Sequence, residues 1–109
     1  MKQILLLCSI LFSFSVSQAQ TKVAPASVVM SAAYKLAGAQ HKKVLLIYHA
    51  SWCGWCRKMD SCLYDASCRK FFEDNFVITH LTIQESKDKK KLENPGAQAM
   101  AEKQGGKDQ

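Results

Sequence analysis

Two cysteines, Cys53 and Cys56, are the residues of this 109-residue chain whose types and spacing best suit chemistry. They follow directly after residues 44–50, a short, continuous run of apolar and β-prone side chains that predicts a buried strand. A helix is expected from about Cys53 to Leu63, because Cys56, Met59 and Leu63 recur at helical spacing. A strand that carries a Cys-x-x-Cys pair onto the first turn of a helix is typical of thiol–disulfide chemistry.

The spacing of the pair suits a reversible disulfide. Residues three apart on a helix share one face, so the two cysteines can meet the geometric limits of a disulfide. The first helical turn also presents unpaired backbone N–H groups and the positive end of the helix dipole. A free cysteine, with a pKa of about 8.5, is only about 3% ionised at pH 7, and a helix N-terminus lowers that pKa. We therefore expect Cys53 to be the attacking nucleophile and Cys56, one turn deeper, to resolve the mixed disulfide.

The residues around the pair are expected to shape its surroundings. Gly54 would let a partner chain approach the sulfur closely, and Trp55 would offer a flat apolar platform beside it. Trp52, which precedes the pair, is expected to shield one side of it. Ordinary surface or core packing is the alternative explanation for both tryptophans.

Other kinds of Cys-x-x-Cys site fit less well. Haem attachment needs a histidine after the second cysteine, where this chain has Arg57. A zinc site built from cysteines needs a second close pair, but Cys62 and Cys68 are separated by five residues. Soft-metal binding by the motif cysteines with Met59, and a purely structural disulfide, remain as alternatives. The main interpretation requires no metal and no organic cofactor.

Cys62 and Cys68 lie where one predicted helix ends and the next begins. A bridge between them would close a seven-residue loop and stabilise the fold by about 2–2.5 kcal/mol in the chain-entropy model. A structural disulfide, free buried thiols and a second redox pair all remain open for these two residues.

Residues 52–60, Trp-Cys-Gly-Trp-Cys-Arg-Lys-Met-Asp, resemble the motif of secreted thioredoxin-like domains, which belong to the thioredoxin superfamily. The similarity continues through residues 71–77 and covers about residues 26–106. It implies an α/β fold with a thioredoxin-like βαβ core of parallel strands and flanking helices. It also implies exchange of disulfides with the thiols and disulfides of protein substrates and with a redox partner that the sequence does not identify. A non-catalytic binding module that uses the same surface is the alternative.

Two features depart from the family pattern. Many thioredoxins carry a buried acid on the strand before the motif, where it accepts a proton from the deeper cysteine, but the matching residue here is Ile47. His49, on the same strand face, is a candidate substitute, although ordinary packing also explains it. Such folds also continue into a cis-proline loop, a β-hairpin and a final helix, and neither Pro25 nor Pro95 is placed to be that proline. We therefore expect this chain to lack the C-terminal half of the fold, which another segment or a partner would complete.

The first 19 residues are predicted to be a signal peptide, which leaves residues 20–109 as one thioredoxin-like domain. Lys2 precedes an apolar stretch at residues 4–14, and residues 17–19 fit a small-residue cleavage site. The stretch is short for a bilayer span, so no stable membrane span is expected after cleavage. We expect export to the periplasm or out of the cell, where disulfide exchange is compatible with the oxidising environment.

The net charge of +6 is expected to be spread over helix surfaces. Its one dense run, at residues 87–91, has no interleaved aromatic side chains, so nucleic-acid binding is not expected.

The remaining elements are expected on both sides of the motif. A strand over residues 76–83 should pair in parallel with residues 44–50, with His80 packed or at the sheet edge. Helices are predicted from Ser27, as the cap, to residue 40, and from a cap at Asp65 or Ser67 to residue 75. The first of these is expected to bury Val29, Ala33, Leu36 and Ala37. Residues 86–103 should be mostly helical, with an interruption at Pro95.

Overall fold

Two parallel strands form the centre of the fold. In the computed structural model, which describes residues 22–106, β1 (Lys43–His49) pairs with β2 (Phe76–Thr82). The pairing runs in register from Lys43 opposite Phe76 to His49 opposite Thr82. Both predicted strands and their parallel order are confirmed to within a residue at each end. The predicted signal peptide lies outside the described residues.

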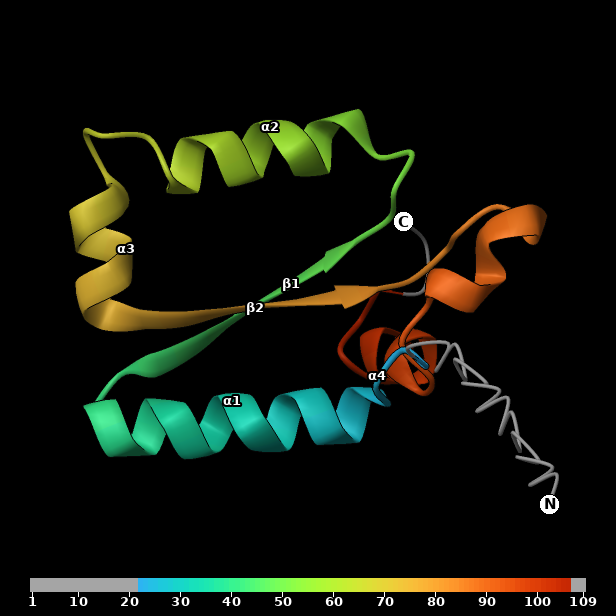
Figure 1. Cartoon of the computed structure of the whole chain (residues 1–109), viewed down its shortest axis with the longest axis horizontal. Coiled ribbons are helices and arrows are strands. Elements are labelled where there is room, and N and C mark those ends of the chain that lie inside the picture. Colours follow the sequence, from blue (N-terminus) through green and yellow to red (C-terminus); the bar gives the residue numbers. More distant parts are fainter. Residues whose placement is uncertain (1–21, 107–109) are drawn as a thin grey trace, which may run out of the picture.

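Helices lie on both sides of this sheet (Figure 1). The connection from β1 to β2 contains α2 (Gly54–Leu63) and α3 (Arg69–Asn75). On the opposite side of the sheet lies α1 (Ala26–Gln40), beside α4 (Ala97–Lys103). A short 3-10 helix, η1 (Lys87–Leu92), follows β2. The mixed α/β architecture with a parallel βαβ core is the one expected from the sequence.

The main core lies between α1, α4 and one face of the sheet. Its centre is Leu81 of β2, which is fully buried and packs with Ala26 and Met30 of α1 and with Ala97 of α4. Partly buried apolar side chains surround this cluster: Val29, Val44, Leu46, Tyr48, Ile83 and Met100. Because side chains alternate along a strand, Ile47 points to the other face, which α2 covers, and it is also buried. Both faces of the sheet thus contribute buried apolar side chains.

Two expectations for α1 are wrong. The helix begins at Ala26, and its N-cap is Pro25, so Ser27 does not cap it with its side chain. Leu36, expected on the buried side, is 47% exposed. The other buried positions expected for this helix are confirmed: Ala33 and Ala37 are buried, and Val29 packs against the core cluster. Ala26 and Met30 complete the buried side.

The segment after β2 is less helical than expected. Residues 87–92 form only the 3-10 turns of η1, since four lysines in this short stretch repel one another and offer no apolar face. Asn94 then ties three segments together: its side chain accepts a hydrogen bond from the Thr82 N–H at 2.7 Å and donates one to the Ala24 carbonyl at 2.8 Å. The Pro95 carbonyl accepts from the Ala26 N–H at 2.8 Å. A break at Pro95 is confirmed, and α4 follows it.

The expected cap of α3 also differs from the structure. The helix begins at Arg69 after Cys68, and the Asp65 side chain instead accepts a hydrogen bond from the Ser67 N–H at 2.9 Å in the turn before it. In the part of the chain that the structure describes, all peptide bonds are trans, including those before both prolines. None of the helices within residues 22–106 combines the length and the apolar character that crossing a membrane requires.

Leu81→Ala is predicted to lower the free energy of unfolding by about 2–5 kcal/mol, because it opens a cavity at the centre of the core. Urea unfolding followed by circular dichroism measures the loss. Leu92→Ala is the matched control, since Leu92 is 41% exposed and its truncation should change stability by no more than about 0.5 kcal/mol. Equal losses in the two variants would contradict the assigned core.

Candidate functional site

Cys53 and Cys56 form a disulfide at the start of α2, with their Cα atoms 5.3 Å apart. Cys53 is the N-cap of the helix, and its sulfur accepts a hydrogen bond from the Cys56 N–H at 3.2 Å. This contact satisfies one of the unpaired donors of the first turn. The Cys53 sulfur therefore occupies the helix end at which negative charge is stabilised. Both cysteines are half-buried, so the deeper burial expected for Cys56 is not evident in the disulfide form.

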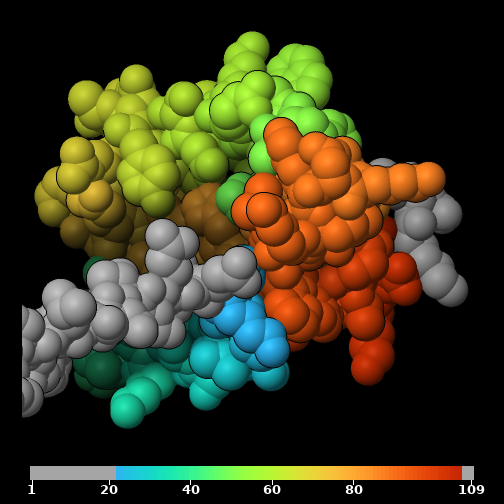
Figure 2. Space-filling model, turned by 45° about the vertical axis from the view of Figure 1, so that its right-hand side comes forward, coloured from blue at the N-terminus to red at the C-terminus, as the bar shows by residue number. Residues whose placement is uncertain are grey.

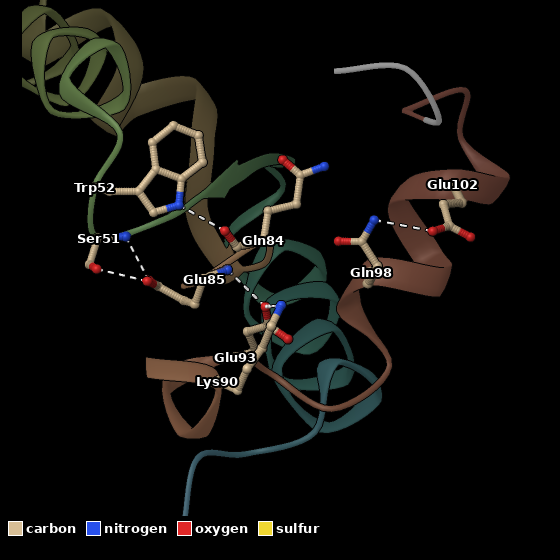
Figure 3. A network of polar contacts seen from close by, with 8 residues as sticks. All are labelled: Ser51, Trp52, Gln84, Glu85, Lys90, Glu93, Gln98 and Glu102. Carbon is tan, nitrogen blue, oxygen red and sulfur yellow. Dashed lines mark hydrogen bonds and ion pairs between the residues drawn. The ribbon is translucent and has the colours of Figure 1, made fainter. Parts of the chain in front are cut away.

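A buried carboxylate holds the loop that carries the pair. Glu85, just beyond β2, is 4% exposed and accepts hydrogen bonds from the Ser51 N–H at 2.6 Å and from the Ser51 hydroxyl at 2.7 Å (Figure 3). On the other side of the loop, the Ser51 carbonyl accepts from Nη1 of Arg57 at 2.8 Å. The backbone two residues before Cys53 is thus fixed both by the end of β2 and by α2.

Trp52 adds a third contact between the same two segments. Its indole Nε1 donates a hydrogen bond to the Gln84 carbonyl at 2.7 Å. Gln84 adopts a left-handed backbone with φ of 53°, a conformation uncommon for residues other than glycine. Figure 2 shows the segment after β2, in orange, lying against the start of α2, in green. The expectation that Trp52 borders the pair fits this position.

A short series of polar contacts connects Glu85 to the segment that follows it. The Glu85 N–H donates to Oε1 of Glu93 at 2.8 Å, and the Lys90 ammonium lies 2.7 Å from the same oxygen (Figure 3). Lys90 lowers the pKa of Glu93, so this carboxylate stays ionised as an acceptor. Sequence reasoning missed Glu85 and Glu93, because nothing in the sequence distinguishes them from ordinary surface acids.

Trp55 stands out into solvent beside the disulfide. It is 78% exposed, and the Lys58 ammonium lies 5.0 Å from its ring centre, a cation–π distance. A side chain at Gly54 would meet only the end of Arg57, at 3.9 Å, so the fold itself leaves open space over this glycine. The expected platform and the expected room for approach are both present in the geometry, while their use by a partner stays a prediction.

A pocket adjoins the disulfide. Cys53, Cys56 and Trp52 line one part of it, and Tyr48 and Ile83 line another. Most of the surface that lines the pocket is apolar, which suits contact with the apolar part of a ligand or a polypeptide.

His49 also lines this pocket, on the strand that leads to the pair. Burial, followed by the nearby His80, lowers the pKa of His49, so its imidazole is neutral at neutral pH. The position at which many thioredoxins carry an acid is Ile47, and it is buried and apolar, as the sequence indicates. His49 and Tyr48 are therefore the titratable side chains that the strand contributes to the pocket beside the cysteines.

His80 has a partner that the sequence did not suggest. Its Nε2 lies 2.7 Å from Oδ1 of Asp60 on α2, and its ring centre is 5.0 Å from that of His49. The expectation of simple packing or an edge position is therefore incomplete. A helix residue and two strand residues form one polar cluster under α2.

Cys62 and Cys68 are free thiols in the structure. The Cys68 thiol donates to the Cys62 carbonyl at 2.6 Å, so the predicted turn does bring the two residues together. Cys62 is exposed and Cys68 is half-buried, so neither of them is a fully buried thiol. The structural disulfide considered from the sequence is not formed.

Comparison with protein-family models matches residues 26–94 to the family described as Thioredoxin. The matched range contains both strands, the cysteine pair and Glu85. Comparisons with curated proteins and with solved structures gave no match.

Glu85→Ala is predicted to lower the free energy of unfolding by about 2–4 kcal/mol, because it removes a charged acceptor from two donors of Ser51. Denaturant unfolding of the disulfide-bonded chain measures the effect. The control is Glu102→Ala, since Glu102 accepts a single exposed hydrogen bond from Gln98 at 3.1 Å, and its loss should stay within about 0.5 kcal/mol. A Glu85 variant as stable as the control would contradict the positioning role of this carboxylate.

Proposed function

Since the chain belongs to the thioredoxin family, we propose that it is an exported thiol–disulfide oxidoreductase that exchanges disulfides with protein substrates through Cys53 and Cys56. One observation carries the proposal: the two cysteines are joined at a helix N-terminus, with the Cys53 sulfur accepting the Cys56 N–H at 3.2 Å. The family and the close cysteine pair together indicate thiol–disulfide redox chemistry. The proposal adds three specific points to this general chemistry: catalytic activity, protein substrates and export.

The exchange proceeds in two displacements. In the reduced chain, the Cys53 thiolate attacks one sulfur of a substrate disulfide, forms a mixed disulfide and releases the other substrate sulfur as a thiolate. The Cys56 thiolate then attacks the Cys53 sulfur, which restores the Cys53–Cys56 disulfide and releases the second substrate thiolate. Two electrons pass from the pair to the substrate, and the reverse sequence oxidises a substrate dithiol.

The helix N-terminus supports the first displacement. The N–H groups of the first turn stabilise the negative sulfur of Cys53 before attack and when it is the leaving group. The Cys56 N–H already points at that sulfur in the oxidised form, so little rearrangement is needed when the pair is reduced. Cys56 must lose a proton before it attacks. The neutral imidazole of His49 lines the same pocket and is the candidate acceptor.

The surface around the disulfide suits a polypeptide substrate. Trp52 and Trp55 are 60% and 78% exposed, and they flank an open glycine next to the attacking sulfur. Aromatic side chains of this kind bury a large area in a complex at low cost in conformational entropy. These exposed rings also favour the second candidate function, a binding module that holds partners without exchanging their disulfides.

Reduction of insulin disulfides by the purified chain separates the two functions. Wild type should accelerate insulin reduction in the presence of dithiothreitol, and Cys53→Ser should abolish the acceleration because the nucleophile is lost. Cys56→Ser should instead accumulate mixed disulfides with substrate, since no thiol resolves them. Precipitation of the insulin B chain and non-reducing electrophoresis provide the two measurements.

Cys62→Ser is the matched control, because Cys62 is a free thiol at the far end of α2. This variant should keep wild-type activity. Equal inactivity of wild type and Cys53→Ser would reject the oxidoreductase in favour of the binding module.

Export is the part of the proposal that rests on residues 1–19. Expression of the whole chain in a bacterium should give a periplasmic product whose N-terminus follows Ala19, because residues 17–19 fit a cleavage site. Cell fractionation followed by N-terminal sequencing checks this. Replacing Leu6 with Arg in the apolar stretch should keep the product in the cytoplasm. An unprocessed cytoplasmic wild type would contradict export.

A further inference from the structure

Three metal-ligating side chains converge under α2 from three separate elements. His49 lies on β1, His80 on β2 and Asp60 on α2. The strand register pairs Ile47 with His80 and His49 with Thr82, so the two histidines are diagonal neighbours on one face of the sheet. The residues are far apart along the chain, and for that reason no metal site is expected here from the sequence alone.

Their ligand atoms are close enough to share one ion. One ligand atom from each of the three side chains lies within 4.8 Å of those of the other two. The Nε2 of His80 is already 2.7 Å from Oδ1 of Asp60, and the two imidazole centres are 5.0 Å apart. Ligands of a tetrahedral zinc ion, at about 2.0–2.1 Å from the metal, lie about 3.4 Å from one another. The Nε2 of His49 also lies 3.1 Å from Oγ1 of Thr82. Coordination would therefore need small side-chain rotations, and binding through this nitrogen would replace that hydrogen bond.

We propose that His49, Asp60 and His80 bind a divalent transition-metal ion of the zinc class. Two imidazole nitrogens and one carboxylate oxygen form a donor set that suits zinc and neighbouring divalent ions, and not calcium or magnesium, which prefer oxygen ligands alone. Three protein ligands leave one tetrahedral position for water.

The environment of the cluster favours occupancy. All three residues are half-buried, with side-chain exposures of 25% for His80 and 30% for Asp60, so an ion can enter and still be partly shielded from solvent. Binding would replace the 2.7 Å hydrogen bond between Nε2 of His80 and Oδ1 of Asp60 with two bonds to one cation.

The ion would join α2 to both strands. Asp60 lies one helical turn after Cys56, so metal binding would anchor the motif helix to the sheet that delivers it. The inference uses none of the thiols, so it stands whether or not the chain exchanges disulfides. It does share His49 with the proposed proton transfer, so a bound ion would take that nitrogen from Cys56.

Zinc titration of the disulfide-bonded chain tests the proposal after all free thiols have been alkylated, so that no cysteine can bind the metal. Isothermal calorimetry should show one zinc ion per chain. His49→Asn and His80→Asn should each weaken that binding at least about tenfold, and Asp60→Asn should weaken it as well. His41→Asn is the matched control, because His41 is exposed, lies outside the cluster and has a left-handed backbone that asparagine tolerates. It should bind zinc as wild type does.

Two measurements on wild type keep the test independent of variant folding. Cobalt(II) should give the visible absorption of a tetrahedral site, without sulfur charge-transfer bands. Zinc at a hundredfold excess over its dissociation constant should raise the folded-to-unfolded ratio about a hundredfold, and so raise the melting temperature by about 10 °C or more. Absence of stoichiometric zinc binding, or unchanged binding in both histidine variants, would overturn the proposal.

Discussion

The in-register parallel pairing of β1 with β2 is the constraint on which the rest of the structure depends. Because His49 lies opposite Thr82, the chain leaves both strands at the same end of the sheet. Ser51 and Trp52 therefore meet Glu85 and Gln84 directly, through hydrogen bonds of 2.6–2.7 Å. The cysteine pair begins immediately after these contacts. A shift in register by one residue would turn the side chains of β2 to the opposite face of the sheet. It would break the contacts of Ser51 and Trp52 with the segment after β2, and it would move His80 away from His49.

Local sequence was sufficient for much of the fold and for the centre of the site. The apolar runs predicted both strands, and the spacing of Cys53 and Cys56 at the start of a helix predicted the disulfide. Both features depend only on residues that are close together along the chain. Glu85 and the partner of His80 could not be predicted, since both depend on which residues the strand register brings together. For α1, the predicted burial of Ala33 and Ala37 is confirmed and that of Leu36 is wrong, because helical spacing alone does not decide which border of the apolar stripe faces the sheet.

Polar side chains supplement the apolar core in joining segments that are far apart along the chain. The buried residues are mainly alanines, and Leu81 is the largest side chain that is fully buried among the described residues. Side chains that bond backbone groups of distant segments supplement this small core. Asn94 joins the end of β2 to the chain before α1, and Glu85 joins the end of β2 to the start of α2. Such hydrogen bonds fix the two segments relative to each other, because each requires a specific donor and a specific acceptor at one distance and angle.

The Lys58 ammonium over the Trp55 ring has a consequence for which molecules can approach. One face of the indole is already occupied by a cation, so an incoming chain can stack only on the other face. A positive charge then lies at the border of that contact. In the proposed exchange, polypeptides with aspartate or glutamate near their cysteines would be attracted on approach, and those with lysine or arginine there would be repelled. Selection among such polypeptides would then begin before any sulfur is within bonding distance.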